Sequence, residues 1–438
     1  MGQAGAVTPP APVRGVGRDA MTLAFGTVLA QALLIGVAPI LTRLFTPAEI
    51  GASSVLVGAM GIWAVSALQL DWAIPLTRGR AATAEVCALS IVTGAALAAV
   101  VALAVALFGD SLAAAANVAE VSEWFWLLPL QVALGAVGLT ATGILVRRRN
   151  FSRLSGVRAA QAAMIAVVGV LAGVAGGGGG ELAAATTAGL AAYTVVAVRG
   201  ALRGEREAFG ETIRGGFSGL RRAVTRWRGF SLWGTASVGA NIAREAVVPV
   251  LVAALYGPAA AGIVFVAQRV LQAPVVLATE AVSRAWYGTA AAIVRSGQGE
   301  LRATLARVTR SLLLIGGAVL AVTVIAGPAL FPIVFGDEFE AGGNVLLALA
   351  PLHFMMFIAM PGGLTLIALD RRKLQAGFTA ARLIGAVATI AIGHELGVSL
   401  TGALALYAAS MALVSAGIGV TAWRLSGRAD ASGVASAP

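Results

Sequence analysis

The sequence predicts an all-α polytopic membrane protein with twelve transmembrane helices arranged as two six-helix repeats. Of the 438 residues, 58% are hydrophobic and only 12% are charged, whereas about 25% is usual in soluble domains. Apolar runs of about 20 residues, the length that crosses a hydrocarbon core of about 30 Å, recur along the whole chain. A short motif in the first quarter returns in the second half. Together these three observations give the fold class.

Each predicted span is an uninterrupted apolar run, and counting the runs gives twelve helices. The region before the first run, residues 1–19, is polar and rich in Pro and Gly. No small-residue cleavage site follows it, so we interpret the first run as a retained helix rather than a signal peptide. The predicted spans are residues 20–42, 50–70, 84–108, 124–145, 156–175, 182–198, 231–255, 259–282, 308–334, 343–368, 374–393 and 399–423.

The charges of the connecting loops alternate in sign. Acidic or neutral loops alternate with basic ones, and both termini are basic. The positive-inside rule therefore places both termini in the cytoplasm; the inner (cytoplasmic) membrane is the expected location of the chain. The alternation also supports an even number of spans, because a missed helix would invert every later loop. The basic loops lie at residues 78–80, 147–153, 199–228, 284–310 and 371–373.

The repeat is carried by the turn that closes a helical hairpin in each half. Residues 44–51 and 255–262 both read Leu-aromatic-x-Pro-Ala-x-x-Gly. A second pair of segments agrees in spacing, with Arg148, Arg149 and Arg158 in one and Arg372, Lys373 and Arg382 in the other. An even number of spans per repeat keeps the two halves in the same orientation, related by an axis along the membrane normal.

This repeat divides the chain into two lobes joined by a basic linker. Aromatic and leucine residues are interleaved with the linker arginines. We therefore expect an amphipathic helix on the anionic inner leaflet rather than a nucleic-acid patch. The predicted units are a tail at 1–19, an N-terminal lobe at 20–198, the linker at 199–229, a C-terminal lobe at 230–425 and a tail at 426–438.

Four charged residues lie inside predicted spans, namely Arg244, Glu245, Arg269 and Glu280. An arginine at mid-membrane depth costs roughly 2.5–3.5 kcal/mol on insertion scales, so such residues usually face a polar interior, pair with an opposite charge or contact an anionic substrate. One interpretation is a pair of salt bridges that locks the second lobe. The other, which we favour, is a cationic cavity wall that binds a phosphate or another anion.

Helical spacing extends this candidate site. Asn241 lies three residues before Arg244, and Gln272 lies three after Arg269, so each pair shares a helix face. Gln31 falls near Asn241 by the repeat. We expect substrate binding by Arg244, Arg269, Asn241, Gln272 and Gln31, and a part for Glu245 and Glu280 in ion or proton coupling. Arg382 has two interpretations, snorkelling to the interface or lining the cavity.

Composition excludes several other classes of site. The single Cys87 excludes an intrachain disulfide, and the two histidines, His353 and His394, are far apart, so we expect no metal site and no cofactor. The net charge of +11 is explained by the loop arginines, so we expect no nucleic-acid partner. The Gly176–Gly180 run lacks the context of a phosphate-binding loop and is interpreted as a flexible hairpin.

Two segments resemble a known family. Residues 39–47 together with Gly51, and Leu70-Asp71-Trp72-Ala73-Ile74-Pro75-Leu76, are similar to the opening signature of Wzx-type polysaccharide and O-antigen flippases. Asp71 fills a place usually held by Glu. These flippases belong to the multidrug/oligosaccharidyl-lipid/polysaccharide (MOP) exporter superfamily. The resemblance implies a V-shaped transporter that flips an undecaprenyl-diphosphate-linked oligosaccharide, with cavity arginines on the diphosphate; here these would be Arg244 and Arg269.

Two alternatives stay open. A drug or cation exporter of the MATE type, from the same superfamily, would favour a cavity dominated by carboxylates. A membrane polysaccharide polymerase would need a large outer loop for catalysis, and the predicted outer loops are short, so we expect a transporter and not an enzyme. The expected partners are the lipid-linked oligosaccharide, membrane lipids and polysaccharide-assembly proteins, and we expect a monomer. The glycan and the coupling ion stay open.

Overall fold

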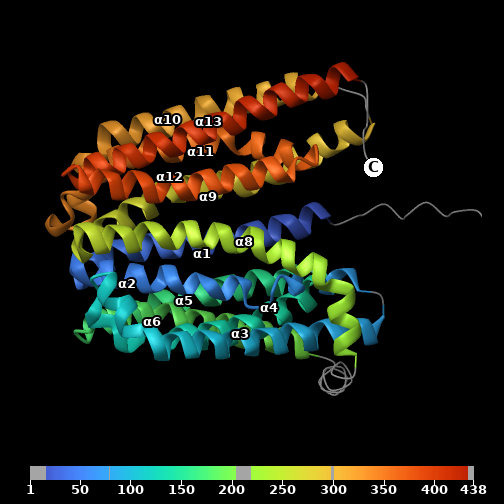
Figure 1. Cartoon of the computed structure of the whole chain (residues 1–438), viewed down its shortest axis with the longest axis horizontal. Coiled ribbons are helices and arrows are strands. Elements are labelled where there is room, and N and C mark those ends of the chain that lie inside the picture. Colours follow the sequence, from blue (N-terminus) through green and yellow to red (C-terminus); the bar gives the residue numbers. More distant parts are fainter. Residues whose placement is uncertain (1–15, 78, 204–218, 297–299, 433–438) are drawn as a thin grey trace, which may run out of the picture.

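The computed structural model describes residues 16–77, 79–203, 219–296 and 300–432. This part of the chain is a bundle of twelve long helices without a β-strand (Figure 1). Eleven of the described segments are long and apolar enough to cross a membrane. The helices are α1 (Val16–Leu44), α2 (Pro47–Met60), α3 (Arg80–Ala115), α4 (Leu127–Arg147), α5 (Phe151–Val174), α6 (Gly179–Leu202), α8 (Leu220–Tyr256), α9 (Pro258–Ser296), α10 (Leu301–Phe335), α11 (Gly342–Ala368), α12 (Arg372–Glu395) and α13 (Leu400–Ser432).

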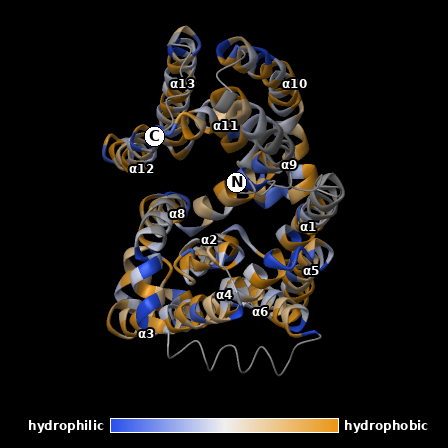
Figure 2. Cartoon of the chain, turned by 90° about the vertical axis from the view of Figure 1, so that its right-hand side faces the viewer, coloured by the Kyte–Doolittle hydropathy of each residue, from blue (hydrophilic) through white to orange (hydrophobic). Residues whose placement is uncertain are grey.

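The helices form two halves with the same internal packing. In the first half α1 packs on α5, α3 on α4, α4 on α6 and α5 on α6. In the second half the corresponding contacts are α8 on α12, α10 on α11, α11 on α13 and α12 on α13. Viewed along the bundle, α1–α6 and α9–α13 form two groups with α8 between them (Figure 2). The predicted fold of two six-helix repeats is confirmed.

The repeated motif builds the helix start that follows each hairpin turn. Thr46 caps α2, since its hydroxyl accepts from the backbone N–H of Glu49 while the Glu49 carboxylate accepts from the backbone N–H of Thr46. Pro47 then occupies the first helical position, where its missing N–H costs nothing. In the second half Gly257 turns the chain with a φ of +93° before Pro258, a conformation that suits glycine.

Several helix boundaries differ from the predicted spans: α2 already ends at Met60, while α9 continues to Ser296 and α13 to Ser432. Helix α3 continues to Ala115, and a short 3₁₀ helix, η4 (Ala119–Trp126), follows it, so most of the predicted outer loop at 109–123 is helical. The alanines at the end of α3, residues 113–115, favour helix. The chain turns at Asn117, whose φ is +55°. Helix α8 begins at Leu220, inside the predicted linker; residues 204–218 of that linker lie outside the described part.

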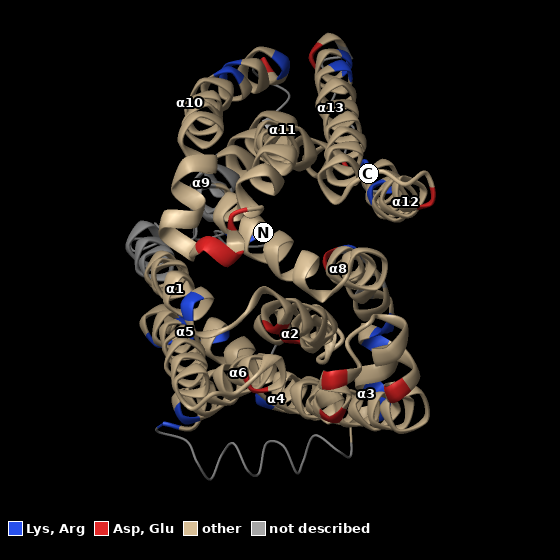
Figure 3. Cartoon of the chain, turned by 90° about the vertical axis from the view of Figure 1, so that its left-hand side faces the viewer, with Lys and Arg blue, Asp and Glu red and all other residues tan. Residues whose placement is uncertain are grey.

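The two ends of the bundle differ in charge. One end, the basic end, carries the start of α1, the end of α13 (Figure 1) and the turn at Arg147–Asn150. The other end, the acidic end, carries the turns with Glu120, Asp337 and Glu338. Viewed along the bundle, most of the ribbon belongs to residues other than Lys, Arg, Asp and Glu (Figure 3). This arrangement fits the alternation in the sequence, and the cytoplasmic location of the basic end stays a prediction from the positive-inside rule.

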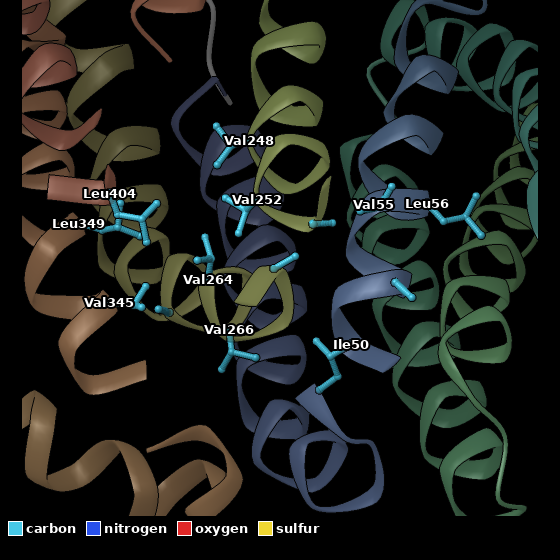
Figure 4. Packing of buried hydrophobic residues seen from close by; sticks show 14 of the residues in the cluster. Ile50, Val55, Leu56, Val248, Val252, Val264, Val266, Val345, Leu349 and Leu404 are labelled. Carbon is cyan, nitrogen blue, oxygen red and sulfur yellow. The ribbon is translucent and has the colours of Figure 1, made fainter. Parts of the chain in front are cut away.

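The buried core joins the two halves toward the acidic end. One apolar cluster includes Ile50 of α2, Val252 of α8 and Val264 of α9 (Figure 4). Toward the basic end the buried residues separate into one cluster of the first half with the start of α8, and one cluster of the second half alone. The halves therefore share a core at the acidic end, whereas at the basic end the start of α8 packs on the first half and the rest of the second half has a cluster of its own.

The crossing of α2 and α9 is the tightest contact between the halves, and it uses the glycines of the repeated motif. A Cβ added at Gly51 would overlap the carbonyl oxygen of Pro258, and a Cβ added at Gly262 would overlap the carbonyl oxygen of Pro47. The two contacts are equivalent by the repeat. Backbone thus meets backbone here, which explains why the motif ends in glycine in both halves.

Candidate functional site

A polar pocket lies between α1 of the first half and α9 of the second half. Its volume is about 250 Å³. The polar lining residues are Gln31, Gln268, Arg269 and Gln272, and the apolar ones are Leu34, Ile35 and Phe265. Three of the five predicted substrate-binding residues, Gln31, Arg269 and Gln272, are therefore brought together.

Helical spacing explains how the pocket is lined. On α9, Phe265, Gln268, Arg269 and Gln272 follow the i, i+3, i+4, i+7 pattern of one helix face. On α1, the lining residues follow the i, i+3, i+4 pattern that begins at Gln31. Gln268 was not predicted from the sequence. Its spacing of four residues from Gln272 places both on one helix face and could have identified it.

Arg269 is the central charged group of the pocket. The carbon of its guanidinium lies 5.7 Å from the ring centroid of Phe265, within reach of a cation–π contact. Within the described part of the chain no ion pair joins Arg269 to a carboxylate. Its charge is therefore uncompensated by these residues.

A second, smaller cavity of about 90 Å³ adjoins the pocket on the side of the first half. Arg269 lines both cavities, and the smaller one is also lined by the hydroxyl residues Thr42, Ser53 and Thr186. The guanidinium thus lies where a ligand could contact polar groups of both halves. A planar arginine fork binds the oxygens of a phosphate in pairs, and the three glutamine amides can both donate and accept hydrogen bonds.

Arg244 is not among the residues that line these two cavities. Its Nη2 donates to Oε1 of the adjacent Glu245 at 3.2 Å, and it lies close enough to His353 of α11, Arg382 of α12 and Tyr407 of α13 to interact with each electrostatically. The structure therefore does not bring Arg244 and Arg269 into one pocket. Arg382 is half-buried, and its Nη2 donates to Oγ of Ser415 at 3.1 Å.

The orientation of α8 about its own axis explains why Arg244 and Arg269 are separated. Ile242, Ala246 and Pro249 face α2, where they lie beside Gly58 and Gly61. Arg244 lies two residues from both Ile242 and Ala246, and so points to the opposite side of the helix. That side faces the interior of the second half.

Two of the remaining predicted residues, Asn241 and Glu280, have side chains outside the described part. Another amide inside a predicted span, Gln131 of α4, is only 2% exposed. Its Nε2 donates to the hydroxyls of Thr187 at 3.0 Å and Thr186 at 3.2 Å. It therefore holds α4 to α6, as buried amides in membrane helices often do.

Sequence comparison decides the family. The profile of a family described as "Polysaccharide biosynthesis protein" matches residues 40–342. The chain belongs to this family. Among proteins with curated functions, none matches the sequence. Within the described residues no group of His, Cys, Asp and Glu side chains could hold a metal ion.

Solved structures show the same fold at low sequence identity. An inward-facing MATE family multidrug resistance transporter of the MOP superfamily is 14% identical with a TM-score of 0.74, covering 94% of this chain and 99% of that one. An outward-facing transporter of the same description is 13% identical with a TM-score of 0.55, covering 96% and 97%. A MOP superfamily transporter from Pyrococcus furiosus, described as having a binding pocket of reverse polarity, is 13% identical with a TM-score of 0.58, covering 95% and 96%.

The family match and the fold agree with the predicted resemblance to polysaccharide flippases with the fold of MOP superfamily transporters. The chain is a multi-pass membrane protein of a polysaccharide-biosynthesis family, and its fold is the one seen in MOP superfamily transporters. Its correspondence with the inward-facing structure is closer than with the outward-facing one.

Proposed function

We propose that this transporter is a flippase that moves an undecaprenyl-diphosphate-linked oligosaccharide across the cytoplasmic membrane for surface polysaccharide biosynthesis. The observation that carries the proposal is Arg269, a guanidinium without a described carboxylate partner in a pocket between the two halves. Membership of a polysaccharide-biosynthesis family supports a substrate of this class.

The chemistry of the pocket suits such a substrate. A diphosphate cannot enter hydrocarbon alone, since burying an unpaired charge is prohibitive. Arg269 offers two parallel N–H donors to the phosphate oxygens. Gln31, Gln268 and Gln272 offer amide groups to the sugar hydroxyls. The lipid tail stays in the bilayer while the polar head occupies the gap between the halves.

Transport then requires that the two halves rock against each other. In the structure the acidic end is closed by the contact of α2 with α9. If the basic end faces the cytoplasm, as the loop charges predict, the state with a closed acidic end receives the substrate from the cytoplasmic side, where the substrate is synthesised. When α2 and α9 separate at Gly51 and Gly262 and the basic end closes, the substrate is released on the outer side. Glu245 and Glu280 keep their proposed part in ion or proton coupling.

A MATE-type drug or cation exporter is the second candidate, because several solved structures with this fold are multidrug transporters. At 13–14% identity these structures show the fold alone. A guanidinium that none of the described carboxylates neutralises repels a cationic drug and attracts an anion. The pocket therefore favours the flippase over the exporter.

The test is flipping of a fluorescent undecaprenyl-diphosphate oligosaccharide in proteoliposomes. We compare the wild-type protein with Arg269→Gln and with Arg307→Gln, an exposed arginine of α10 that serves as the matched control. The expected result is a flipping rate at least about ten-fold lower for Arg269→Gln, because a hydrogen bond to a charged group contributes about 1.5–3 kcal/mol, and no change for Arg307→Gln. Wild-type flipping by Arg269→Gln at equal protein content would overturn the proposal.

A further inference from the structure

We propose that the second half contains a separate binding site for one small inorganic anion of the chloride class, between the guanidinium groups of Arg244 and Arg382. This site is distinct from the pocket around Arg269 and does not depend on the proposed substrate. Its groups come from four helices of one half, namely α8, α11, α12 and α13.

The first observation is the gathering of donors. Arg244, Arg382 and Tyr407 lie near enough to one another to interact electrostatically. Nη2 of Arg382 donates to the buried Ser415 hydroxyl at 3.1 Å. His353 borders the cluster with its Nδ1 3.1 Å from the carbonyl oxygen of Leu349.

The second observation is a pair of unused donors. The Nε atoms of Arg244 and Arg382 are both buried, and neither has a hydrogen-bond partner within the described part of the chain. Buried donors without a partner are rare in native proteins. That two charged donors share this state in one cluster points to an acceptor that both would bind.

The third observation is the balance of charge. The only carboxylate paired with this cluster in the described residues is Glu245, whose side chain is 69% exposed while that of Arg244 is 15% exposed. The carboxylate thus faces outward and the guanidinium inward. One positive charge remains in excess, since two arginines face one glutamate and the hydroxyls are neutral. A monovalent anion neutralises this excess and satisfies both Nε donors.

Packing limits the size of the ligand. Buried apolar residues lie one helical turn from two members of the cluster, Val248 from Arg244, and Leu404 and Met411 from Tyr407. A chloride-sized anion fits such surroundings better than a diphosphate. The anion would bridge α8 to α12 and α13, and so fix α8, which lies between the two groups of helices (Figure 2), to its own half.

Chloride itself is the probe. We measure the apparent melting temperature of the purified full-length protein while chloride replaces gluconate at constant ionic strength. The expected wild-type result is a saturable rise in melting temperature. For Arg382→Gln, the expected result is that at least ten times more chloride is needed for the same rise. Tyr407→Phe, which removes one hydroxyl, is expected to weaken the response in part.

A third variant separates this proposal from the proposed function. Arg269→Gln is expected to keep the full chloride response, because Arg269 lies in the other pocket. A wild-type protein that does not respond to chloride would overturn the anion site, and so would an unchanged response in both Arg382→Gln and Tyr407→Phe. Neither of these results bears on flipping by Arg269. Loss of the response in Arg269→Gln would also overturn the site as a separate one.

Discussion

A side chain at the crossing of α2 and α9 should destabilise the state in which the acidic end is closed. Gly262→Ala adds a Cβ that overlaps the carbonyl oxygen of Pro47 and lies 2.9 Å from the backbone nitrogen of Gly51. Both obstructing atoms belong to backbone, so no rotamer change can relieve the clash. The two helices must therefore move apart, and the apolar packing around Ile50 and Val264 loosens with them.

The size of the effect follows from the cost of overpacking. Inserting one methyl group into a well-packed contact costs about 1–3 kcal/mol. Because the open state of the acidic end does not contain this contact, the whole cost falls on the closed state. The ratio of closed to open molecules should then fall by about 5- to 150-fold. Gly317→Ala on α10 is the matched control, since a Cβ there meets nothing within 4 Å.

Distances between spin labels at the acidic end measure this ratio. Glu120→Cys in the first half and Glu338→Cys in the second replace exposed residues. Cys87, which is 1% exposed, is replaced by Ala to leave only the two label sites. We expect longer distances to gain population in Gly262→Ala and to stay unchanged in Gly317→Ala. The same distance distribution in both variants would refute the assignment of this crossing as the seal.

Three further predictions concern stability. Burial raises the pKa of Asp71, in η2 (Leu70–Trp72) between two membrane segments, from 3.8 to about 6. The folded state therefore binds the proton more tightly than the unfolded state, and stability falls as the pH rises from about 4 through 6. Asp71→Asn should be more stable than the wild type at pH 7.5 by up to about 3 kcal/mol and equally stable below about pH 4, as melting temperatures from pH 4 to 8 would show; a constant difference would contradict this. Gln131→Leu should lose about 1–2 kcal/mol, because it removes the donor to Thr186 and Thr187, while the flipping rate per folded molecule stays the same; a lower rate would indicate a part in transport. Arg222→Ala breaks an ion pair of 2.7 Å with Glu85, but the arginine side chain is 76% exposed, so we expect a loss below about 1 kcal/mol by thermal unfolding.

Local sequence patterns were sufficient to predict the architecture. Apolar runs and loop charges give the helices and their order, because a membrane span is defined by its own composition. The motif ending in Gly51 and Gly262 gave the repeat, and its physical reason became clear only with the structure, in which the two glycines meet across the halves. Helix ends such as Ala115 were less predictable, since no charge or proline marks them.

The candidate site was predicted in part. Arg269 and Gln272 share a helix face that is visible in the sequence, and Gln31 was suggested by the repeat; all three line one pocket. The rotation of α8, which turns Arg244 away from this pocket, depends on its packing against α2 and α12. Periodicity within α8 does not contain that information. For the same reason the meeting of Arg244 with Tyr407 of α13 could not be foreseen.

The measurement that tests the central claim most directly is the affinity of the purified protein for an undecaprenyl-diphosphate oligosaccharide. It compares the wild type, Arg269→Gln and Arg307→Gln at matched protein concentration in nanodiscs. The claim predicts that Arg269→Gln weakens binding about ten-fold or more, while Arg307→Gln binds as the wild type does. Equal affinities in all three proteins would contradict it.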